Sequence, residues 1–293
     1  MRLKFFYLTV IPLIALIQTA RASGFPRVDA DITTYDDKVA TLNTSFNQTA
    51  ANPSDKKWIV SKLQHMVDVD QYTRKYNNTP YDHAYSNAEK SEFINQFGVR
   101  WRSVDTNNTS DLKELIKIYT WFMISEFGQR ADQNAWLLVQ HADMDYAFQK
   151  SVLTILSGLW QKGETNPTNY AYLFDRVAAS FNDPTQTTLQ RYGTQGECTG
   201  PGTWEPLPME DPERIDDRRA TVGLGTEADY IKLFKDICHF ADKFIEKKAS
   251  EIQFPQRTFR PIFLEDQVPR ENRSSGVHGK SPLQRPFRNP CNA

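Results

Sequence analysis

Apolar residues recur at spacings of three and four along most of the chain, which is the pattern of amphipathic helices. These stripes fall within residues 39–46, 59–67, 93–97, 112–123, 148–159, 170–181 and 230–240. Alternation of apolar and polar residues, which would indicate strands, is scarce, and we identify no hairpin signal. The sequence therefore predicts an all-α fold, an irregular multi-helix domain with long loops.

Local signals place several helix ends. Ser86 and Glu89 have the spacing of a capping box, and Gly98 is expected to end the helix that follows. Asn166 followed by Pro167 is typical of an N-cap and the first helical turn. These signals predict where helices begin without saying how they pack.

Other segments lack helical periodicity. Residues 193–208 read as a Gly- and Pro-rich loop, and the polar stretch 23–56 is expected to pack loosely. From residue 254 onward the chain is rich in Pro and Arg with little periodicity, which is typical of a disordered tail. We therefore expect an N-terminal helical region at 23–108, a helical domain at 109–250 and a disordered basic tail at 251–293.

The first 22 residues have the pattern of a signal peptide. Arg2 and Lys4 precede an apolar run at 5–17, and Ala20 and Ala22 flank a cleavage site that gives a mature start at Ser23. The run is shorter than the roughly 20 residues of a membrane-spanning helix, although an uncleaved anchor is the alternative. We expect a secreted or periplasmic protein, with no stable membrane insertion after cleavage.

Charge and cysteine content narrow the functional classes. The formal net charge is −1, without the concentrated basic stripe of a nucleic-acid-binding protein. Among the three cysteines, Cys198 and Cys238 are the expected disulfide pair, because Cys291 lies in the predicted tail. No close Cys-x-x-Cys or Cys/His spacing indicates structural zinc.

The segment 136–149, WLLVQHADMDYAFQ, places polar residues directly after an apolar run. In a helix from Asp132 to His141, the imidazole of His141 shares the inward face of Leu137 and Leu138. Asp143 or Asp145 would then cap the next helix. The residues fit two interpretations, a buried hydrogen-bonded histidine beside an N-cap or a working site.

Further polar motifs follow in order: YAYLFDRV at 170–177, QRYGTQ at 190–195, and EDPERIDDRRATVGL at 210–224. Together with WLLVQHADMDYAFQ they resemble the DUF6624 family, a domain family of unknown function. The resemblance covers about residues 109–230. The family has no assigned reaction. The resemblance therefore indicates which residues are candidates for a site, but not which reaction they would catalyse.

Motifs from four segments can meet around one pocket of a helical domain. His141 is the candidate base, since its charge changes near neutral pH, and Asp143 or Asp175 are candidates to orient it. Arg side chains could hold an anionic group, and Tyr192 with the following backbone could donate hydrogen bonds. The candidate substrate-binding residues are Gln140, Asp145, Arg176, Arg191, Tyr192, Gln195, Arg218 and Arg219.

Each candidate also has a structural interpretation. Asp175 and Arg176 could form an ion pair between helices, and 216–219 could be a solvated helix start. His141, Asp143, Asp145 and Asp175 do not match the ligand spacing of a known metal motif, and Asp143 does not open an EF-hand loop. We predict no metal and no cofactor.

Two classes of function remain open. One is an exported acid/base enzyme, such as a hydrolase, that uses His141 and Asp143. The alternative is a non-catalytic module that binds a small molecule, a peptide or a host protein; an effector or toxin would also fit export. The partner is thus an unknown small molecule or protein.

Overall fold

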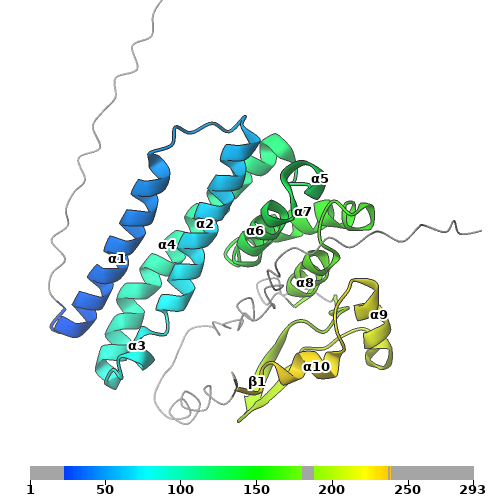
Figure 1. Ribbon diagram of the computed structural model, residues 1–293. Coiled ribbons are helices and arrows are strands. Elements are labelled where there is room, and N and C mark those ends of the chain that lie inside the picture. Colours follow the sequence, from blue (N-terminus) through cyan, green and yellow to red (C-terminus); the bar gives the residue numbers. More distant parts are fainter. Residues whose placement is uncertain (1–22, 180–187, 237, 239–293) are drawn as a thin grey trace, which may run out of the picture.

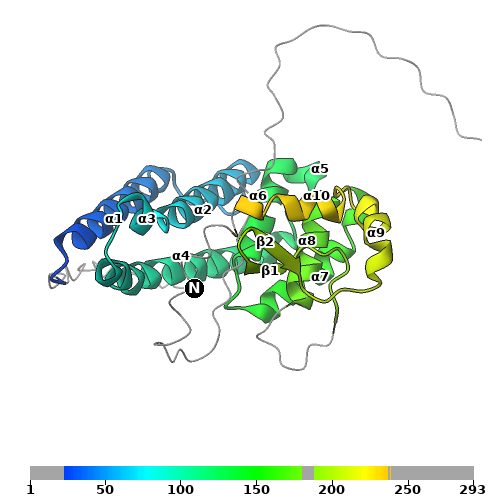
Figure 2. The same ribbon diagram turned by 90° about the horizontal axis from the view of Figure 1, so that it is seen from below.

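The computed structural model describes residues 23–179, 188–236 and 238. The predicted signal peptide (1–22), the predicted tail (251–293) and the ends of the last two predicted stripes lie outside the described residues. The described chain is mostly helical with one two-stranded sheet, which confirms the all-α prediction. Three long helices lie side by side on one flank, and shorter helices with the hairpin form the other (Figures 1 and 2).

The long-helix flank packs around two hydrophobic clusters. Its elements are α1 (Pro26–Asn47), α2 (Lys56–Tyr76), α3 (Thr79–Asp82) and α4 (Asn87–Tyr119). An aromatic cluster that includes Tyr35, Phe93 and Phe97 joins α1 to α4. The main core continues from α2 and α4 into the second flank, so that both flanks share one interior.

Helix α1 corrects the expectation that the stretch 23–56 packs loosely. Val28, Ile32 and Tyr35 are buried and lie four and three residues apart, on one face of the helix. The Tyr35 hydroxyl forms a hydrogen bond with the hydroxyl of Thr73 on α2, at 2.8 Å. These buried residues attach the otherwise polar helix to its neighbours.

Helix α4 begins where the capping box predicts and runs past its predicted end. The Ser86 side chain accepts the Glu89 N–H, and the Glu89 carboxylate accepts the Ser86 N–H. Gly98 does not end the helix, which continues to Tyr119, and an added Cβ there would meet only Arg102 at 3.5 Å. A helical glycine costs about 1 kcal/mol relative to alanine, which the buried flanking residues outweigh.

The second flank carries the remaining elements. They are α5 (Ile124–Phe127), α6 (Gln129–Gln140), α7 (Tyr146–Ser157), η1 (Trp160–Lys162), α8 (Pro167–Ala178), β1 (Gly196–Gly200), β2 (Thr203–Pro206), η2 (Pro212–Arg214), α9 (Ile215–Thr221) and α10 (Glu227–Lys232). The predicted cap of α8 is confirmed, since the Asn166 side chain accepts the Thr168 N–H at 3.0 Å. Helices α6, α7 and α8 pack on one another, and α6 also packs on α2.

The hairpin of β1 and β2 was not predicted from the sequence. The strands are antiparallel, and Cys198 pairs with Trp204. The strands are only five and four residues long, too short for their alternation to stand out in the sequence. The hairpin is stabilised by packing on a distant segment, since Trp204 stacks on Phe234 with ring centroids 4.4 Å apart. The predicted Cys198–Cys238 disulfide is confirmed and ties β1 to the segment after α10.

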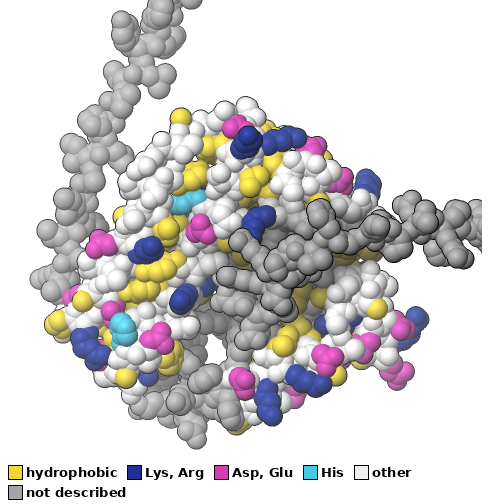
Figure 3. All heavy atoms as spheres, viewed as in Figure 1, with side chains coloured by type: hydrophobic (Ala, Val, Ile, Leu, Met, Phe, Trp, Pro, Cys, Tyr) yellow, Lys and Arg dark blue, Asp and Glu magenta, His cyan; other side chains and the backbone are white. Residues whose placement is uncertain are grey.

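The hydropathy of the helices and the distribution of surface charge relate to the expectations about membranes and nucleic acids. Within the described ranges, none of the helices is long and apolar enough to cross a membrane. On the face shown in Figure 3, Lys and Arg side chains are interspersed with Asp and Glu and do not form one basic stripe.

Candidate active site

His141 lies at the end of α6, where two packed flanks meet. Its backbone N–H donates to the Leu137 carbonyl at 3.2 Å, and its side chain is buried with those of Leu137 and Leu138. The predicted helix from Asp132 to His141 is confirmed to within one turn, because α6 already starts at Gln129. The apolar face of α6 therefore carries the imidazole into the interior.

The carboxylate beside His141 belongs to Asp70 of α2. Its Oδ2 and Oδ1 lie 2.8 and 2.9 Å from His141 Nδ1, and the two side chains are 1% and 2% exposed. The sequence proposed Asp143 or Asp175 for this position. Asp70 is 71 residues away in the chain, although a signal existed: it follows Met66 and Val67 at helical spacing and so places a carboxylate on an apolar stripe.

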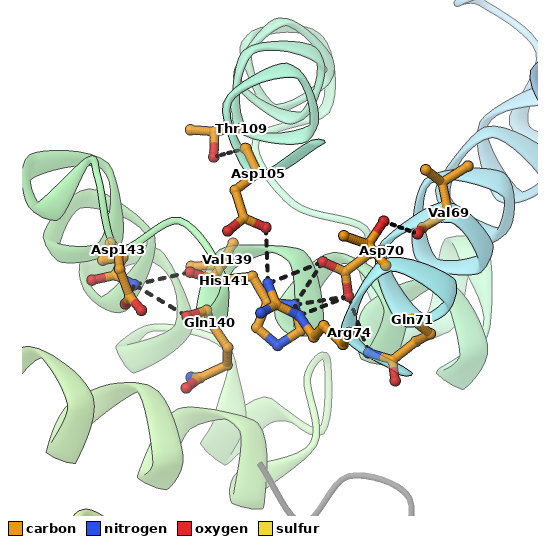
Figure 4. A network of polar contacts seen from close by, with 12 residues as sticks. Val69, Asp70, Gln71, Arg74, Asp105, Thr109, Val139, Gln140, His141 and Asp143 are labelled. Carbon is orange, nitrogen blue, oxygen red and sulfur yellow. Dashed lines mark hydrogen bonds and ion pairs between the residues drawn. The ribbon is translucent and has the colours of Figure 1, made fainter. Parts of the chain in front are cut away.

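Arg74, one turn after Asp70, connects two carboxylates. Its Nη2 lies 3.1 Å from Asp70 and 2.8 Å from Asp105 of α4. Its guanidinium lies over the Trp101 ring, 4.8 Å from the centroid. Figure 4 shows Asp70, Asp105 and His141 gathered around this guanidinium.

The contacts at Nδ1 define the tautomer of His141. Arg74 Nε also lies 2.8 Å from Nδ1 and 3.3 Å from Asp70. Were Nδ1 to accept from Arg74, its lone pair would face the carboxylate oxygens of Asp70. The Arg74 Nε–H is aimed at both Nδ1 and Asp70 Oδ2. We assign the proton of the neutral imidazole to Nδ1, which donates to Asp70, so that the Arg74 Nε–H donates to Asp70 Oδ2. Any further proton then goes to Nε2.

Burial and charge set the protonation states. Burial lowers the pKa of His141 to about 4, against the opposing charge of Asp70 and with the help of Arg74 and Arg176. Burial alone would raise the pKa of Asp70, but His141 and Arg74 outweigh it and lower that pKa. At neutral pH the pair is thus a neutral imidazole held by an ionised carboxylate.

The pKa of Asp105 is shifted in the opposite direction from that of Asp70. Burial raises its pKa to about 7, and the charges of Asp70 and Asp143 add to that effect, while Arg74 opposes it. The network therefore contains one carboxyl group that changes its charge near neutral pH.

Asp143 lies in the turn between α6 and α7 and pairs with Arg176 of α8. Arg176 Nε donates to Asp143 Oδ1 at 2.8 Å, and its Nη2 contacts Oδ2. Gln149 donates to the same carboxylate at 3.1 Å and to the Val139 carbonyl at 3.1 Å. The Arg176 side chain is buried, whereas that of Asp143 is 46% exposed, so this pair extends the network toward the surface.

Gln140 and Asp145 have local contacts. With its amide oxygen directed toward Trp136, Gln140 accepts the indole N–H at 3.1 Å and the Leu173 N–H at 3.2 Å. Asp145 caps α7 by accepting the Phe148 N–H at 3.0 Å, one of the two caps that the sequence proposed, and forms an ion pair with Lys113.

Asp175 points to a different neighbour from Arg176. Its carboxylate is buried and accepts the backbone N–H groups of Arg191, Tyr192 and Thr194 at 2.7, 3.1 and 2.9 Å. Within the same loop, the Gln195 N–H donates to the Gln190 side chain at 2.7 Å. Asp175 therefore anchors the loop 190–195 to α8.

The arginines of α9 hold the other side of that loop. Arg218 donates to the Arg191 carbonyl at 2.7 Å, and Arg219 donates to the Tyr192 carbonyl at 2.6 Å. Arg191 forms an ion pair with Glu210 at 3.2 Å, and the Tyr192 side chain is buried. The residues of the motif at 216–219 therefore hold the loop formed by the motif at 190–195 in place.

Apart from Asp145, which caps α7, the predicted site residues thus fall into two groups. Gln140, His141, Asp143 and Arg176 lie around the network of α2, α4 and α6, whereas Asp175 and the residues of α9 surround the loop. In the part of the chain that the structure describes, no group of three His, Cys, Asp or Glu side chains is arranged to hold a metal ion.

A neutral imidazole on a buried carboxylate, next to a carboxyl that titrates near neutrality, has the components for proton transfer.

Neither a curated protein nor a solved structure matches the chain. A family model does match, over residues 59–243, a range that starts in α2 and includes Asp70, Arg74 and Asp105 as well as the four motifs. The chain therefore belongs to DUF6624, a family of unknown function.

Proposed function

We propose that this protein is an acid/base enzyme, of the hydrolase type, whose base is His141. The observation that carries the proposal is the Asp70 carboxylate at 2.8 Å from Nδ1, inside a buried network with Arg74. Asp70 stabilises the imidazolium that forms when Nε2 accepts a proton, and it fixes the ring orientation. At neutral pH the imidazole is uncharged and available as a base, because burial lowers its pKa to about 4.

A purely structural function explains the network less well. Buried ion pairs contribute little net stability, because desolvation of the charges offsets their attraction. Here one interior region of described residues holds Asp70, Arg74 and Asp105 together with His141. The half-exposed Asp143 continues that network to the surface.

The protein is proposed to act outside the cytoplasm. The signal-like pattern of residues 1–22 motivates this proposal, and the Cys198–Cys238 disulfide supports it, since disulfides persist in oxidising compartments. N-terminal sequencing of the protein recovered from culture medium or periplasm should start at Ser23. A start at Met1 would contradict cleavage.

The proposed activity is tested with a panel of chromogenic esters, phosphate esters, glycosides and amides. A substrate turned over by the wild type should lose about 10²- to 10⁴-fold in rate in His141→Gln, and Asp70→Asn should fall in the same direction. The matched control is His83→Gln, which alters a surface histidine paired with Asp31. Circular dichroism and thermal unfolding establish that each variant is folded.

Turnover that survives in folded His141→Gln would contradict the proposal. The binding-module alternative would then lead, with the same network acting as a fixed ligand-binding surface.

A further inference from the structure

Trp101 lies on α4, one helical turn before Asp105, and contacts both the aromatic cluster and the network around His141. Its ring meets the buried ring of Phe97 edge-on, with centroids 6.1 Å apart and an interplanar angle of 88°. The guanidinium carbon of Arg74 lies 4.8 Å from the centroid of the same ring. At that distance the negative face of an indole ring attracts the cation.

The indole of Trp101 makes a second contact with the network. Its side chain donates a hydrogen bond to the carboxylate of Asp105, and the only donor of an indole is its N–H group. Residues four apart on a helix share one face, so this bond forms within α4. Asp105 in turn lies 2.8 Å from Arg74 Nη2. Trp101 therefore contacts both members of the Arg74–Asp105 ion pair, one through its ring and the other through its N–H.

This ion pair is connected to His141 through Asp70. Arg74 lies close to the Asp70 carboxylate, with Nη2 at 3.1 Å from Oδ1 and Nε at 3.3 Å from Oδ2. The same carboxylate accepts the Nδ1–H of His141 at 2.8 Å. The position of the guanidinium therefore affects where the Asp70 carboxylate lies, and that carboxylate orients the imidazole.

The two ends of this series of contacts differ in exposure. The side chains of His141 and Asp70 are 2% and 1% exposed, whereas those of Arg74 and Asp105 are 16% and 15% exposed. A long charged side chain that reaches water loses rotamer freedom when it is held in one ion pair, and the loss weakens the pair. Packing against Trp101 restricts the guanidinium at the place where water competes for it.

We propose that Trp101 is a positioning residue of this site. Its ring and its N–H hold the Arg74–Asp105 ion pair in place, and the pair fixes the carboxylate that orients His141. The proposal rests on the proposed function and adds to it a residue that takes no part in the proton transfer.

Two substitutions separate the contacts of Trp101. Trp101→Phe keeps an aromatic face for Arg74 and removes the N–H donor, whereas Trp101→Leu removes both. The matched control is Trp160→Leu, because Trp160 is also partly buried and its ring stacks on Tyr170 of α8, with centroids 5.4 Å apart. Circular dichroism and thermal unfolding establish that each variant is folded.

The position of Arg74 is measured by NMR without a substrate. Its Nε–H resonance is assigned by its loss in Arg74→Lys, and the ring current of Trp101 should shift it from the usual position of an arginine Nε–H. The shift should disappear in Trp101→Leu, persist in part in Trp101→Phe, and be unchanged in Trp160→Leu. An unchanged Arg74 resonance in folded Trp101→Leu would overturn the proposal, whether or not the site proves to be catalytic.

The N–H contact is measured by ¹³C titration of the Asp105 carboxyl carbon, assigned by its loss in Asp105→Asn. The charged groups that face this carboxyl are Arg74, Asp70 and Asp143, and Trp101→Phe retains all of them. Because the hydrogen bond from Trp101 lowers the pKa of Asp105, the midpoint should rise in Trp101→Phe. A midpoint equal to that of the wild type would contradict the donation.

The effect on activity is measured with a substrate that the wild type turns over. Trp101→Leu should lower kcat about tenfold, the rate equivalent of one partly desolvated cation–π contact, and should leave KM nearly unchanged. Trp101→Phe should recover most of that loss. A wild-type kcat in Trp101→Leu, with or without a raised KM, would overturn the positioning role. An unaffected His141→Gln would instead overturn the proposed function.

Discussion

His141 and Asp105 are predicted to give the protein two opposite dependences of stability on pH. The perturbations that separate them are His141→Gln and Asp105→Asn, each compared with the wild type at every pH. Because every other titrating group is present in both proteins, the replaced group dominates the difference in unfolding free energy.

The sign for His141 follows from its lowered pKa. The unfolded chain binds a proton near pH 6.5 that the native imidazole binds only near pH 4. Its contribution is thus complete above pH 6.5 and is lost as pH falls, by about 3 kcal/mol at roughly 1.4 kcal/mol per pKa unit. His141→Gln lacks that loss, so its stability relative to the wild type should rise toward acid pH.

The sign for Asp105 is reversed. The native carboxyl keeps its proton up to about pH 7, whereas the unfolded one releases it near 3.8. Its contribution is complete below pH 3.8 and is lost as pH rises, by about 4 kcal/mol. Asp105→Asn should therefore gain stability relative to the wild type toward neutral pH.

The assay is urea unfolding followed by circular dichroism at several values between pH 4.5 and 7.5. Across that window each difference should change by about 2–3 kcal/mol, in opposite directions for the two variants. A difference that stays flat for Asp105→Asn would refute a raised pKa at that position. Parallel slopes in the two variants would refute the description of the whole network.

Three further predictions concern the second flank. Asp175→Ala should cost about 3 kcal/mol or more, because two buried N–H groups and a partly buried one lose their acceptor; an unchanged thermal midpoint would argue against the loop anchor. Gly196→Ala should destabilise the hairpin by about 1–3 kcal/mol, since the new Cβ would lie 2.2 Å from the Trp204 ring. The control in the same unfolding assay is Gly200→Ala, whose new Cβ would meet nothing closer than 4.0 Å. Cys238→Ser should cost about 4 kcal/mol for the 40-residue separation that the disulfide closes, and identical midpoints of wild type with and without reductant would contradict that contribution.

The helix starts were predictable because their causes are local. The capping box at Ser86, the Asn166 cap and the Asp145 cap all depend on hydrogen bonds between residues two or three apart. Such contacts are encoded by short motifs. The end of α4 could not be predicted in this way. The tendency of Gly98 to end a helix is weaker than the packing of the buried residues on either side of it.

The contacts between distant segments could not be predicted from one sequence. The motif residues indicated His141, but its carboxylate comes from α2, and Asp105 comes from a third helix. Sequence order likewise placed Asp175 and Arg176 together, although adjacent residues on α8 point toward different neighbours. A carboxylate on the apolar stripe of α2 was the available signal for Asp70, which the structure pairs with His141.

The most direct test of the central claim is the tautomer of His141, measured by long-range ¹H–¹⁵N correlation NMR on the folded protein at pH 7. The resonances of His141 are assigned by their loss in His141→Gln. We expect a neutral ring with its proton on Nδ1, held by Asp70, and a deprotonated Nε2 that serves as the base. A proton on Nε2, with Nδ1 bare, would mean that Asp70 does not hold the ring as described, and the acid/base account of this site would fail.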